Sequence, residues 1–199
     1  VVPGSEEKLD MLQYCVQTLT ERGYVFIGMD HFAKPDDELS IALKEGFLQR
    51  NFQGYSTYAD CDLVAIGVSS IGKIGSTYSQ NERDIDAYYA ALDAGHLPIM
   101  RGYQLNQDDI LRRNIIQDLM CRFSLDYQIY ESVFGIPFSR YFAAELEDMK
   151  QLETLGLVRL KPHSLTVTPK GRFLIRNIAM VFDYHLRHKE TKAKYSQTV

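Results

Sequence analysis

Two stretches of the sequence carry residues that could hold a ligand or perform chemistry. The longer one, residues 51–75, runs from Asn51-Phe52-Gln53-Gly54-Tyr55-Ser56 to a short apolar run at 63–68, and small residues follow that run at once. Because backbone can approach a ligand closely only where side chains are small, this segment predicts a ligand-facing edge. The alternative is that its glycines only form a turn, and the pattern alone favours neither.

The second stretch is Asp30-His31, which follows a predicted strand at residues 24–29. A carboxylate beside an imidazole can take up and release protons, and strand ends often carry such groups. Asp and His are also common loop residues, so a purely structural role is the alternative.

The elements that would position these residues alternate between helix and strand. Residues 6–22 have apolar side chains at helical spacing, between a possible cap at Ser5 and a terminator at Gly23. Residues 24–29 read as a buried strand and residues 40–48 as a short helix. The run at 63–68 suits a strand buried on both faces, as in a parallel sheet. In an α/β barrel, ligands bind at the carboxyl ends of such strands.

The charge balance divides the chain into two predicted domains, residues 1–104 and residues 105–199. Residues 1–100 hold 7 Lys or Arg against 15 Asp or Glu, whereas residues 101–199 hold 15 against 11. A helix at residues 81–94, capped by Asn81, and an extended connector at residues 96–104 close the acidic part. A basic tail is expected at the end of the second domain.

The second domain has a different pattern, in which helices precede a hairpin and a final helix. Asn106 is predicted to cap a helix to about residue 123, with Asp109 at its third position and Leu111, Ile115 and Leu119 in one apolar row. The pattern continues with a helix at 139–155, a hairpin at 157–167 and a last helix opened by Thr168-Pro169. This order indicates a winged-helix-like module.

The three cysteines, Cys15, Cys61 and Cys121, are too far apart in sequence to form a zinc or iron–sulfur motif. Their odd number argues against a disulfide framework, and Cys15 and Cys121 fall on apolar helix stripes, where buried thiols are expected.

No apolar run approaches the roughly 20 residues that cross a bilayer. The N-terminus lacks the features of a signal peptide and an initiator Met. We therefore expect a cytoplasmic protein with no membrane partner, and a chain that is a processed or truncated piece.

Several motifs in the same order resemble the oxygen-independent coproporphyrinogen III oxidases, which are radical S-adenosylmethionine (SAM) enzymes of haem biosynthesis. In the first half they are Gly28-Met29-Asp30-His31-Phe32-Ala33, Pro35-Asp36-Asp37-Glu38-Leu39 and Asn51-Phe52-Gln53-Gly54-Tyr55. In the second half, residues 168–178 resemble the C-terminal domain of that family. The family's Cys-x-x-x-Cys-x-x-Cys motif is missing from this sequence, so the chain resembles only the C-terminal part of the enzyme.

The resemblance implies a fold of mixed class, α/β plus α+β. The last elements of a partial (β/α) radical-SAM barrel would precede a helical, winged-helix-like domain. It implies oxidative decarboxylation of coproporphyrinogen III to protoporphyrinogen IX by an enzyme that uses SAM and a [4Fe–4S] cluster. It further implies SAM contacts at Phe52, Gln53 and Ile71, although Phe52 and Ile71 also suit an ordinary core. It assigns no catalytic residue and no metal ligand to this chain, and we expect the chain alone to be inactive.

The partners that follow from the resemblance are coproporphyrinogen III and the missing N-terminal half of the barrel. Without that half, unpaired strand edges at 24–29 or 63–68 are expected to cause self-association. The alternative function is a winged-helix nucleic-acid-binding module, supported by the hairpin and by Lys170, Arg172 and Arg176. The acidic pI of about 5.7 and the lack of a basic stripe argue against it, so no nucleic-acid partner is expected.

Overall fold

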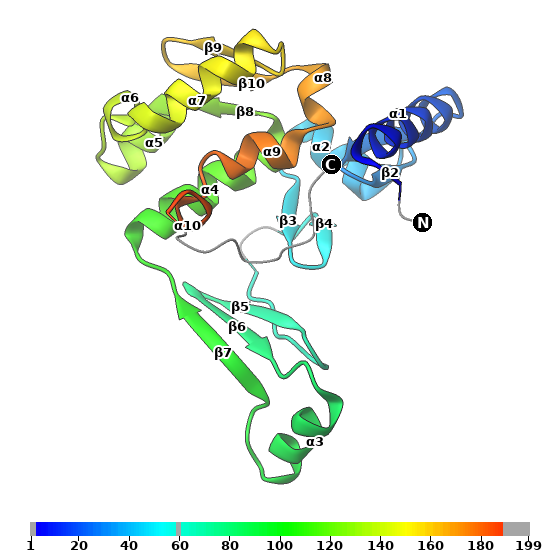
Figure 1. Ribbon diagram of the computed structural model, residues 1–199, viewed down its shortest axis with the longest axis vertical. Coiled ribbons are helices and arrows are strands. Elements are labelled where there is room, and N and C mark those ends of the chain that lie inside the picture. Colours follow the sequence, from blue (N-terminus) through cyan, green and yellow to red (C-terminus); the bar gives the residue numbers. More distant parts are fainter. Residues whose placement is uncertain (1–2, 59–60, 189–199) are drawn as a thin grey trace.

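A computed structural model describes residues 3–58 and 61–188 of the chain. Its N-terminal region begins with a long helix and continues through two small hairpins separated by a short helix (Figure 1). These elements are α1 (Ser5–Glu21), β1 (Val25–Gly28), β2 (His31–Ala33), α2 (Glu38–Glu45), β3 (Gln49–Asn51) and β4 (Gly54–Ser56). The predicted helices and the strand at 24–29 are therefore present, but Gly4 rather than Ser5 is the N-cap of α1.

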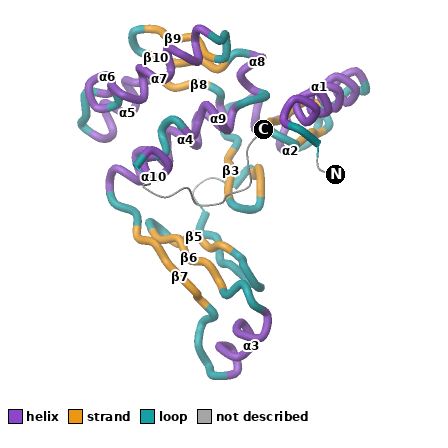
Figure 2. Tube along the Cα trace, in the orientation of Figure 1, coloured by secondary structure: helices purple, strands orange, loops and turns teal. Residues whose placement is uncertain are grey.

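A three-stranded sheet with one short helix follows and extends away from the rest of the molecule (Figures 1 and 2). Its strands are ordered β5-β6-β7 and are all antiparallel. The elements are β5 (Ile71–Ile74), β6 (Thr77–Asn81), α3 (Ile85–Asp93) and β7 (Ile99–Gln104). The connector expected at 96–104 is thus mostly an edge strand of this sheet.

The prediction of a buried parallel strand at 63–68 is wrong. Only Leu63 forms a bridge, an antiparallel one to Lys73, and Val64 and Ile66 are 68% and 83% exposed. The segment is instead a loop, and side chains form hydrogen bonds with its backbone polar groups. Asn81 donates to the carbonyls of Ala65 and Gly67 at 3.3 and 3.0 Å. An apolar run is buried on both sides only when other elements cover both faces of the sheet, and the described residues leave Val64 and Ile66 uncovered.

Asn81 does not cap a helix, contrary to expectation. Helix α3 begins four residues later, at Ile85, and the side chain of Asp84 caps it by accepting a hydrogen bond from the N–H of Ala87 at 3.0 Å. Asn81 itself is only 4% exposed and is occupied with the loop at 65–67. A buried amide with two carbonyl partners fixes that loop against the sheet.

The C-terminal region contains the predicted helices, hairpin and final helical segment, with more breaks than the sequence indicated. Its elements are α4 (Gln107–Arg122), β8 (Ser124–Asp126), α5 (Tyr127–Phe134), α6 (Phe138–Tyr141), α7 (Ala143–Thr154), β9 (Val158–Lys161), β10 (Ser164–Val167), α8 (Pro169–Arg172), α9 (Ile175–Met180) and α10 (Tyr184–Arg187). Strand β8 joins the hairpin as a third strand, in the order β8-β10-β9. The mixed content, with no closed barrel in the described part of the chain, agrees with the predicted fold class. The expected basic tail falls largely on residues 189–199, outside the described ranges.

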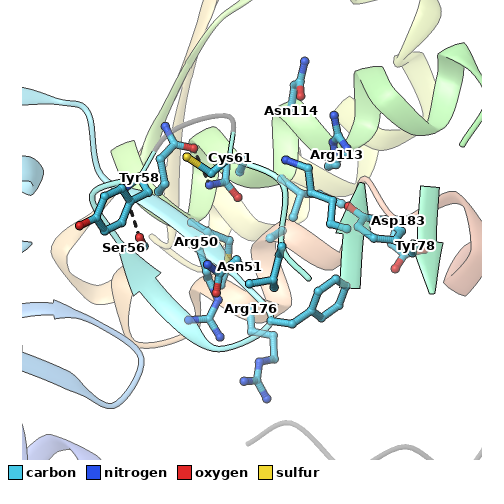
Figure 3. Close-up of a pocket in the computed structure, with 18 of the residues that line it drawn as sticks. Arg50, Asn51, Ser56, Tyr58, Cys61, Tyr78, Arg113, Asn114, Arg176 and Asp183 are labelled. Carbon is cyan, nitrogen blue, oxygen red and sulfur yellow. Dashed lines mark hydrogen bonds between the residues drawn. The ribbon is translucent and has the colours of Figure 1, made fainter. Parts of the chain in front are cut away.

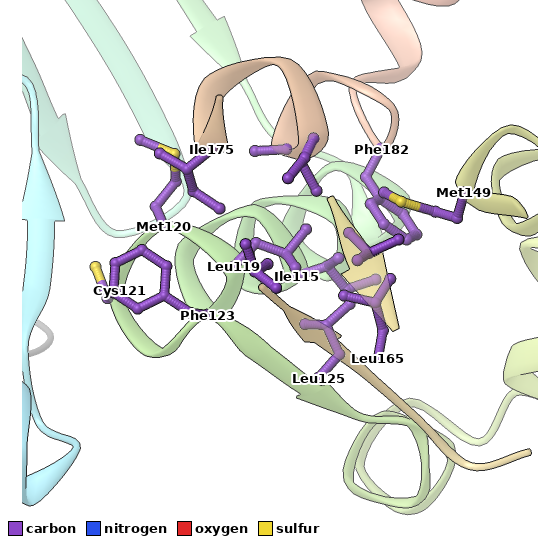
Figure 4. Packing of buried hydrophobic residues seen from close by; sticks show 14 of the residues in the cluster. Ile115, Leu119, Met120, Cys121, Phe123, Leu125, Met149, Leu165, Ile175 and Phe182 are labelled. Atoms are coloured by element: carbon purple, nitrogen blue, oxygen red, sulfur yellow. The ribbon is translucent and has the colours of Figure 1, made fainter. Parts of the chain in front are cut away.

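Helix α4 is the centre of the hydrophobic core. Asn106 and Asp109 form the predicted capping box, with backbone-to-side-chain hydrogen bonds of 2.9 and 3.0 Å. Leu111, Ile115 and Leu119 are at most 2% exposed. Ile115 and Leu119 lie among the buried side chains of the sheet β8-β10-β9 and of α9 (Figure 4). Each such buried side chain contributes about 1.5–3 kcal/mol. In the described ranges, no helix combines the length and apolar character required to cross a membrane.

Long-range hydrogen bonds attach the N-terminal hairpins and the end of α2 to this C-terminal core. Their donors and acceptors are Tyr55 to the Met120 carbonyl, Gln117 to Gln49, Arg122 to the Gly46 carbonyl, and Arg172 to the Phe26 carbonyl. The sheet β5-β7 is attached separately, since the Tyr103 hydroxyl donates to the Asp109 carboxylate at 3.0 Å. Although burial opposes the change, hydrogen bonds from Asn106, His185 and Tyr103 lower the pKa of Asp109. The carboxylate that caps α4 thus also holds the sheet.

A buried ion-pair network anchors α4 to the helices that follow it. The Arg112 guanidinium donates to Asp108 and Glu145 at 2.8 Å each and to the Phe182 carbonyl at 3.2 Å. Arg112 is 9% exposed and Glu145 is 5% exposed. Burial alone would lower the pKa of Arg112, but its hydrogen bonds to Glu145 and Asp108 raise it. Each charged group is therefore satisfied only while all of them are present.

We expect the substitution Arg112→Met to lower the free energy of unfolding by about 3–5 kcal/mol, because it leaves Glu145 buried without its partner. Arg187→Met is the matched control, since Arg187 pairs with Asp148 at the surface at 2.7 Å. That control is expected to cost about 1 kcal/mol or less. Urea denaturation followed by circular dichroism measures both, and equal losses would contradict the role assigned to the network.

Candidate ligand-binding cleft

A cleft of about 710 Å³ lies where the β3–β4 hairpin, the sheet β5-β6, helix α4 and helix α9 meet (Figure 3). Its volume is in the usual range of small-molecule sites. Its walls combine apolar, aromatic and cationic side chains. They include Arg50, Phe52, Tyr58, Leu63, Lys73, Tyr78, Arg113, Ile116, Met120, Arg176 and Met180.

The cleft has an excess of positive charge. Arg50, Lys73, Arg113 and Arg176 line it, against the carboxylates of Asp62 and Asp183. Both carboxylates are engaged elsewhere, because Asp62 accepts from the N–H of Gly75 at 2.8 Å and Asp183 caps α10. No ion pair within the described ranges involves any of the four cations. The cleft is thus suited to an anionic ligand.

Arg50 is positioned by the β3–β4 hairpin. It lies opposite Tyr55 in the antiparallel register, and its guanidinium carbon is 5.0 Å from the centroid of the Tyr55 ring. The Tyr55 hydroxyl in turn donates to the Met120 carbonyl at 3.1 Å, and burial raises the pKa of Tyr55 to about 12. Tyr55 therefore remains protonated and holds the hairpin, with Arg50, against α4.

The predicted SAM contacts occupy different places. Phe52 lines the cleft, is 53% exposed, and meets the Tyr78 ring edge-on with centroids 5.3 Å apart. Phe52 is therefore not part of the hydrophobic core that this chain forms. Gln53 is exposed in the β3–β4 turn, outside the cleft lining, and its N–H donates to Asn51 at 2.8 Å.

Ile71 also lies outside the cleft lining, at the start of β5, where it is half-buried opposite Gln80. Side chains two residues apart on a strand share a face, so Ile71 faces the same side of the sheet as Lys73. Tyr78 is paired with Lys73 and shares that side as well. Lys73 and Tyr78 line the cleft, so Ile71 lies on the face of the sheet that borders the cleft but is not itself part of the cleft lining.

Asp30 and His31 form a hydrogen-bonded pair, with the Nδ1 and Oδ1 atoms 2.8 Å apart, and neither residue lines the cleft. The His31 ring packs edge-on against Tyr55 at 5.1 Å. A Cβ at position 54 would lie 2.9 Å from His31 Nε2, so Gly54 is needed for this close packing. The pair thus lies beside the hairpin that carries Arg50, and the structural alternative accounts for its contacts.

The described residues do not provide a metal centre. Within residues 3–58 and 61–188, no three His, Cys, Asp or Glu side chains are grouped so that they could hold a metal ion. Cys121 is buried as predicted, but Cys15 is exposed, contrary to expectation, since α1 turns that side toward solvent. Burial raises the pKa of the Cys121 thiol to about 12, which disfavours the thiolate that a metal requires. An iron–sulfur cluster therefore does not fit this part of the chain.

The sequence did not identify the cationic residues of the cleft as a group, and only Arg176 was singled out, as support for the nucleic-acid alternative. Arg50, Lys73, Arg113 and Arg176 come from elements far apart in the chain, and no local spacing connects them. The only available signal was that Arg50 directly precedes the Asn51-Phe52-Gln53 motif. Their convergence follows because the hairpin and α9 both pack against α4.

Comparison with known proteins gives consistent matches. Residues 105–174 match the HemN C-terminal domain. The oxygen-independent coproporphyrinogen III oxidases of Synechocystis and Escherichia coli are 48% and 46% identical, over the whole of this chain and 43% of each relative. A solved structure of the Escherichia coli coproporphyrinogen III oxidase (HemN), described as a radical SAM enzyme, matches with a TM-score of 0.87 and 47% identity. That match covers 92% of this chain and 42% of the other. The chain spans less than half the length of these relatives.

The burial of Cys121 predicts that its thiol reacts slowly in the folded protein. At about pH 8, iodoacetamide is expected to modify Cys15 and Cys61, which are exposed, and to leave Cys121 unmodified until the protein is unfolded. The reason is that the thiolate is the reactive form and Cys121 is held as the thiol. Peptide mass mapping of samples labelled with and without urea measures this. Labelling of folded Cys121 as fast as Cys15 would show that α4 does not pack as described.

Proposed function

We propose that this chain forms the C-terminal part of an oxygen-independent coproporphyrinogen III oxidase, because it matches 43% of the length of relatives with that name and its residues 105–174 match the HemN C-terminal domain. The full-length enzyme would decarboxylate coproporphyrinogen III oxidatively to protoporphyrinogen IX in haem biosynthesis. The observation that carries the proposal is the structural match, with 47% identity, which extends over 92% of the chain and so includes both of its regions. Residues 1–104 would complete the barrel, and residues 105–199 would form the C-terminal domain.

The reactive chemistry in this proposal belongs to SAM and a [4Fe–4S] cluster, which when bound supply the radical that removes hydrogen from a propionate side chain. The described residues do not fit the cluster, so its ligands are assigned to the missing N-terminal half of the barrel. This chain's own residues would bind and orient ligands and exclude water. Its aromatic and apolar cleft walls suit that role.

Within the proposed enzyme, Phe52, Gln53 and Ile71 would contact SAM. The exposed ring of Phe52 and the half-buried side chain of Ile71 offer apolar surface, while the exposed amide of Gln53 can both donate and accept hydrogen bonds. All three lie on the β3–β4 hairpin or at the start of β5, next to the cleft. Phe52 and Gln53 are exposed and Ile71 is half-buried in this chain, so each offers some surface to a ligand shared with the N-terminal half.

The missing half of the barrel would also cover apolar side chains that this chain exposes. Among the described residues, Val64, Ile66, Ile74 and Leu97 are 57–83% exposed and lie on or beside the sheet β5-β7. Exposed apolar patches of this kind mark interaction surfaces.

In the isolated chain, the free edge of β1 would favour self-association, which concentration-dependent sedimentation would reveal and a strictly monomeric profile would exclude. The exposed thiols of Cys15 and Cys61 suit the reducing cytoplasm.

The isolated chain is expected to bind no iron–sulfur cluster and to show no decarboxylase activity, because the cluster ligands are absent from it. The full-length enzyme, reconstituted anaerobically and supplied with SAM, is expected to convert coproporphyrinogen III to protoporphyrinogen IX. Iron and sulfide assays and chromatography of the oxidised porphyrins measure both. A stoichiometric cluster on the isolated chain, or a cluster-loaded full-length protein without activity, would contradict the proposal.

The SAM contacts are tested by Ile71→Ala and Gln53→Ala in the full-length enzyme. We expect both variants to cleave SAM more weakly while iron content and thermal midpoint stay near those of the unsubstituted enzyme. Ile129→Ala and Gln151→Ala are matched controls on exposed faces of α5 and α7. If Ile71 is an ordinary core residue, its substitution will instead lower stability by about 2–5 kcal/mol. Normal SAM cleavage in both variants would refute the assignment.

A further inference from the structure

Two arginines of the cleft have buried hydrogen-bond donors without acceptors. In the described part of the chain, the buried side-chain atoms that lack a partner are Ser40 Oγ, Arg50 Nη1, Arg113 Nη1 and Arg172 Nε. Of these residues, Arg50 and Arg113 line the cleft. An unsatisfied buried donor costs stability, and a charged one costs more. Such donors persist where a ligand or another part of the protein supplies the acceptor.

Arg113 differs in this respect from Arg112, the adjacent arginine on α4. Arg112 is fully engaged with Asp108, Glu145 and a carbonyl. Arg113, the next residue, has no carboxylate partner among the described residues. Helix α4 thus directs one arginine into the core, where it is fully paired, and the next into the lining of the cleft, where its guanidinium has no carboxylate partner among the described residues.

Arg50 and Arg113 come from different walls of the cleft, the hairpin strand β3 and helix α4 (Figure 3). The hairpin is held to α4 by the hydrogen bonds of Tyr55 and Gln117, so the two guanidinium groups are attached to one rigid frame. Lys73 and Arg176 add positive charge at the sheet and at α9. Two fixed guanidinium groups on separate walls suit separate carboxylates of one ligand, since guanidinium matches carboxylate geometry.

The remaining walls determine the body of that ligand. Phe52 and Tyr78 offer aromatic surface, and Ile116, Met120 and Met180 offer aliphatic surface. A ligand with a large apolar body and several carboxylates satisfies both kinds of wall. A small inorganic anion would leave the apolar surface uncovered, and an apolar molecule would leave the buried donors unpaired.

We propose that Arg50 and Arg113 bind propionate carboxylates of a tetrapyrrole, and so form a substrate-positioning subsite within this chain. The assignment rests on the proposed function for the identity of the ligand, because coproporphyrinogen III carries four propionates on an apolar macrocycle. Arg50 and Arg113 act as binding residues and take no part in bond breaking. The competing occupants are a carboxylate side chain from the N-terminal half and the carboxylate of SAM.

Binding is tested on the 199-residue chain with coproporphyrin III, the fluorescent oxidised form of the substrate, and with its tetramethyl ester. We expect the free acid to bind at least about tenfold more tightly than the ester, because charge-assisted hydrogen bonds contribute about 1.5–3 kcal/mol each. Equal affinity for acid and ester would overturn the proposal without recourse to any variant.

Variants then assign the effect to residues. Arg50→Gln and Arg113→Gln are each expected to weaken binding of the free acid by about 10- to 100-fold and to leave the ester unaffected. Arg159→Gln, on the exposed face of β9, is the matched control and is expected to bind like the unsubstituted chain. Arg50→Lys and Arg113→Lys keep the charge and are expected to restore part of the affinity. Unchanged binding in the Gln variants would refute the assignment.

The full-length enzyme separates this proposal from the function on which it rests. If the enzyme is active, Arg50→Gln and Arg113→Gln are expected to raise KM for coproporphyrinogen III while leaving cluster content and SAM affinity unchanged. A loss of SAM affinity with normal porphyrin binding would assign the arginines to SAM. A lower thermal midpoint with unchanged KM would assign them to a carboxylate of the N-terminal half. Either outcome overturns the subsite and leaves the decarboxylase function standing, whereas an inactive, cluster-loaded enzyme refutes the function itself.

Discussion

Helix α4 packs against the apolar core on one face and forms hydrogen bonds with the N-terminal hairpin on another. Most of the structure depends on these two sets of contacts. One face buries Leu111, Ile115 and Leu119 in the C-terminal core. Another face carries Gln117 and the Met120 carbonyl, which bind the β3–β4 hairpin. A helix with apolar rows on one side and hydrogen-bonding groups on another can join two regions. Buried residues of the N-terminal region, such as Ile27 and Leu48, belong to the same hydrophobic cluster. The cleft exists because the hairpin and α9 pack on neighbouring faces of this helix.

The difference between Arg112 and its neighbour Arg113 shows how stability and ligand binding are separated on one element. A buried charge is tolerated when every donor has an acceptor, and Arg112 meets that condition with Glu145, Asp108 and the Phe182 carbonyl. Arg113 and Arg50 do not meet it within the described residues. Each unpaired buried donor lowers the stability of the folded chain, and a carboxylate that binds in the cleft would remove that cost. The requirement that stabilises Arg112 in the core therefore favours anion binding at Arg50 and Arg113.

The sheet β5-β7 has the opposite character, because much of its apolar surface faces outward. All residues of β7 are exposed, and the loop at 63–68 exposes Val64 and Ile66. The hydrogen bond from Tyr103 to Asp109 attaches the sheet to α4, and the side chain of Asn81 holds the loop against the sheet. Among the described residues 61–104, no Ala, Val, Leu, Ile, Met, Phe or Tyr side chain is fully buried. A chain that spans less than half the length of its relatives is consistent with such surfaces. Their apolar side chains explain why the sequence pattern indicated burial that these residues alone do not provide.

What the sequence determined by itself was local. The capping box of Asn106 and Asp109, the Thr168-Pro169 helix start and the hairpin at 157–167 all involve residues only a few positions apart, so their chemistry is complete within the segment. The motifs that resemble the coproporphyrinogen oxidases likewise lie within short stretches. Whether residues 63–68 form a strand was decided by distant neighbours, and the pattern was misleading there. Arg50 and Arg113 are 63 positions apart, and only the tertiary structure places both in the lining of one cleft. The sequence could not indicate their unpaired donors, because a donor becomes buried only when the chain packs.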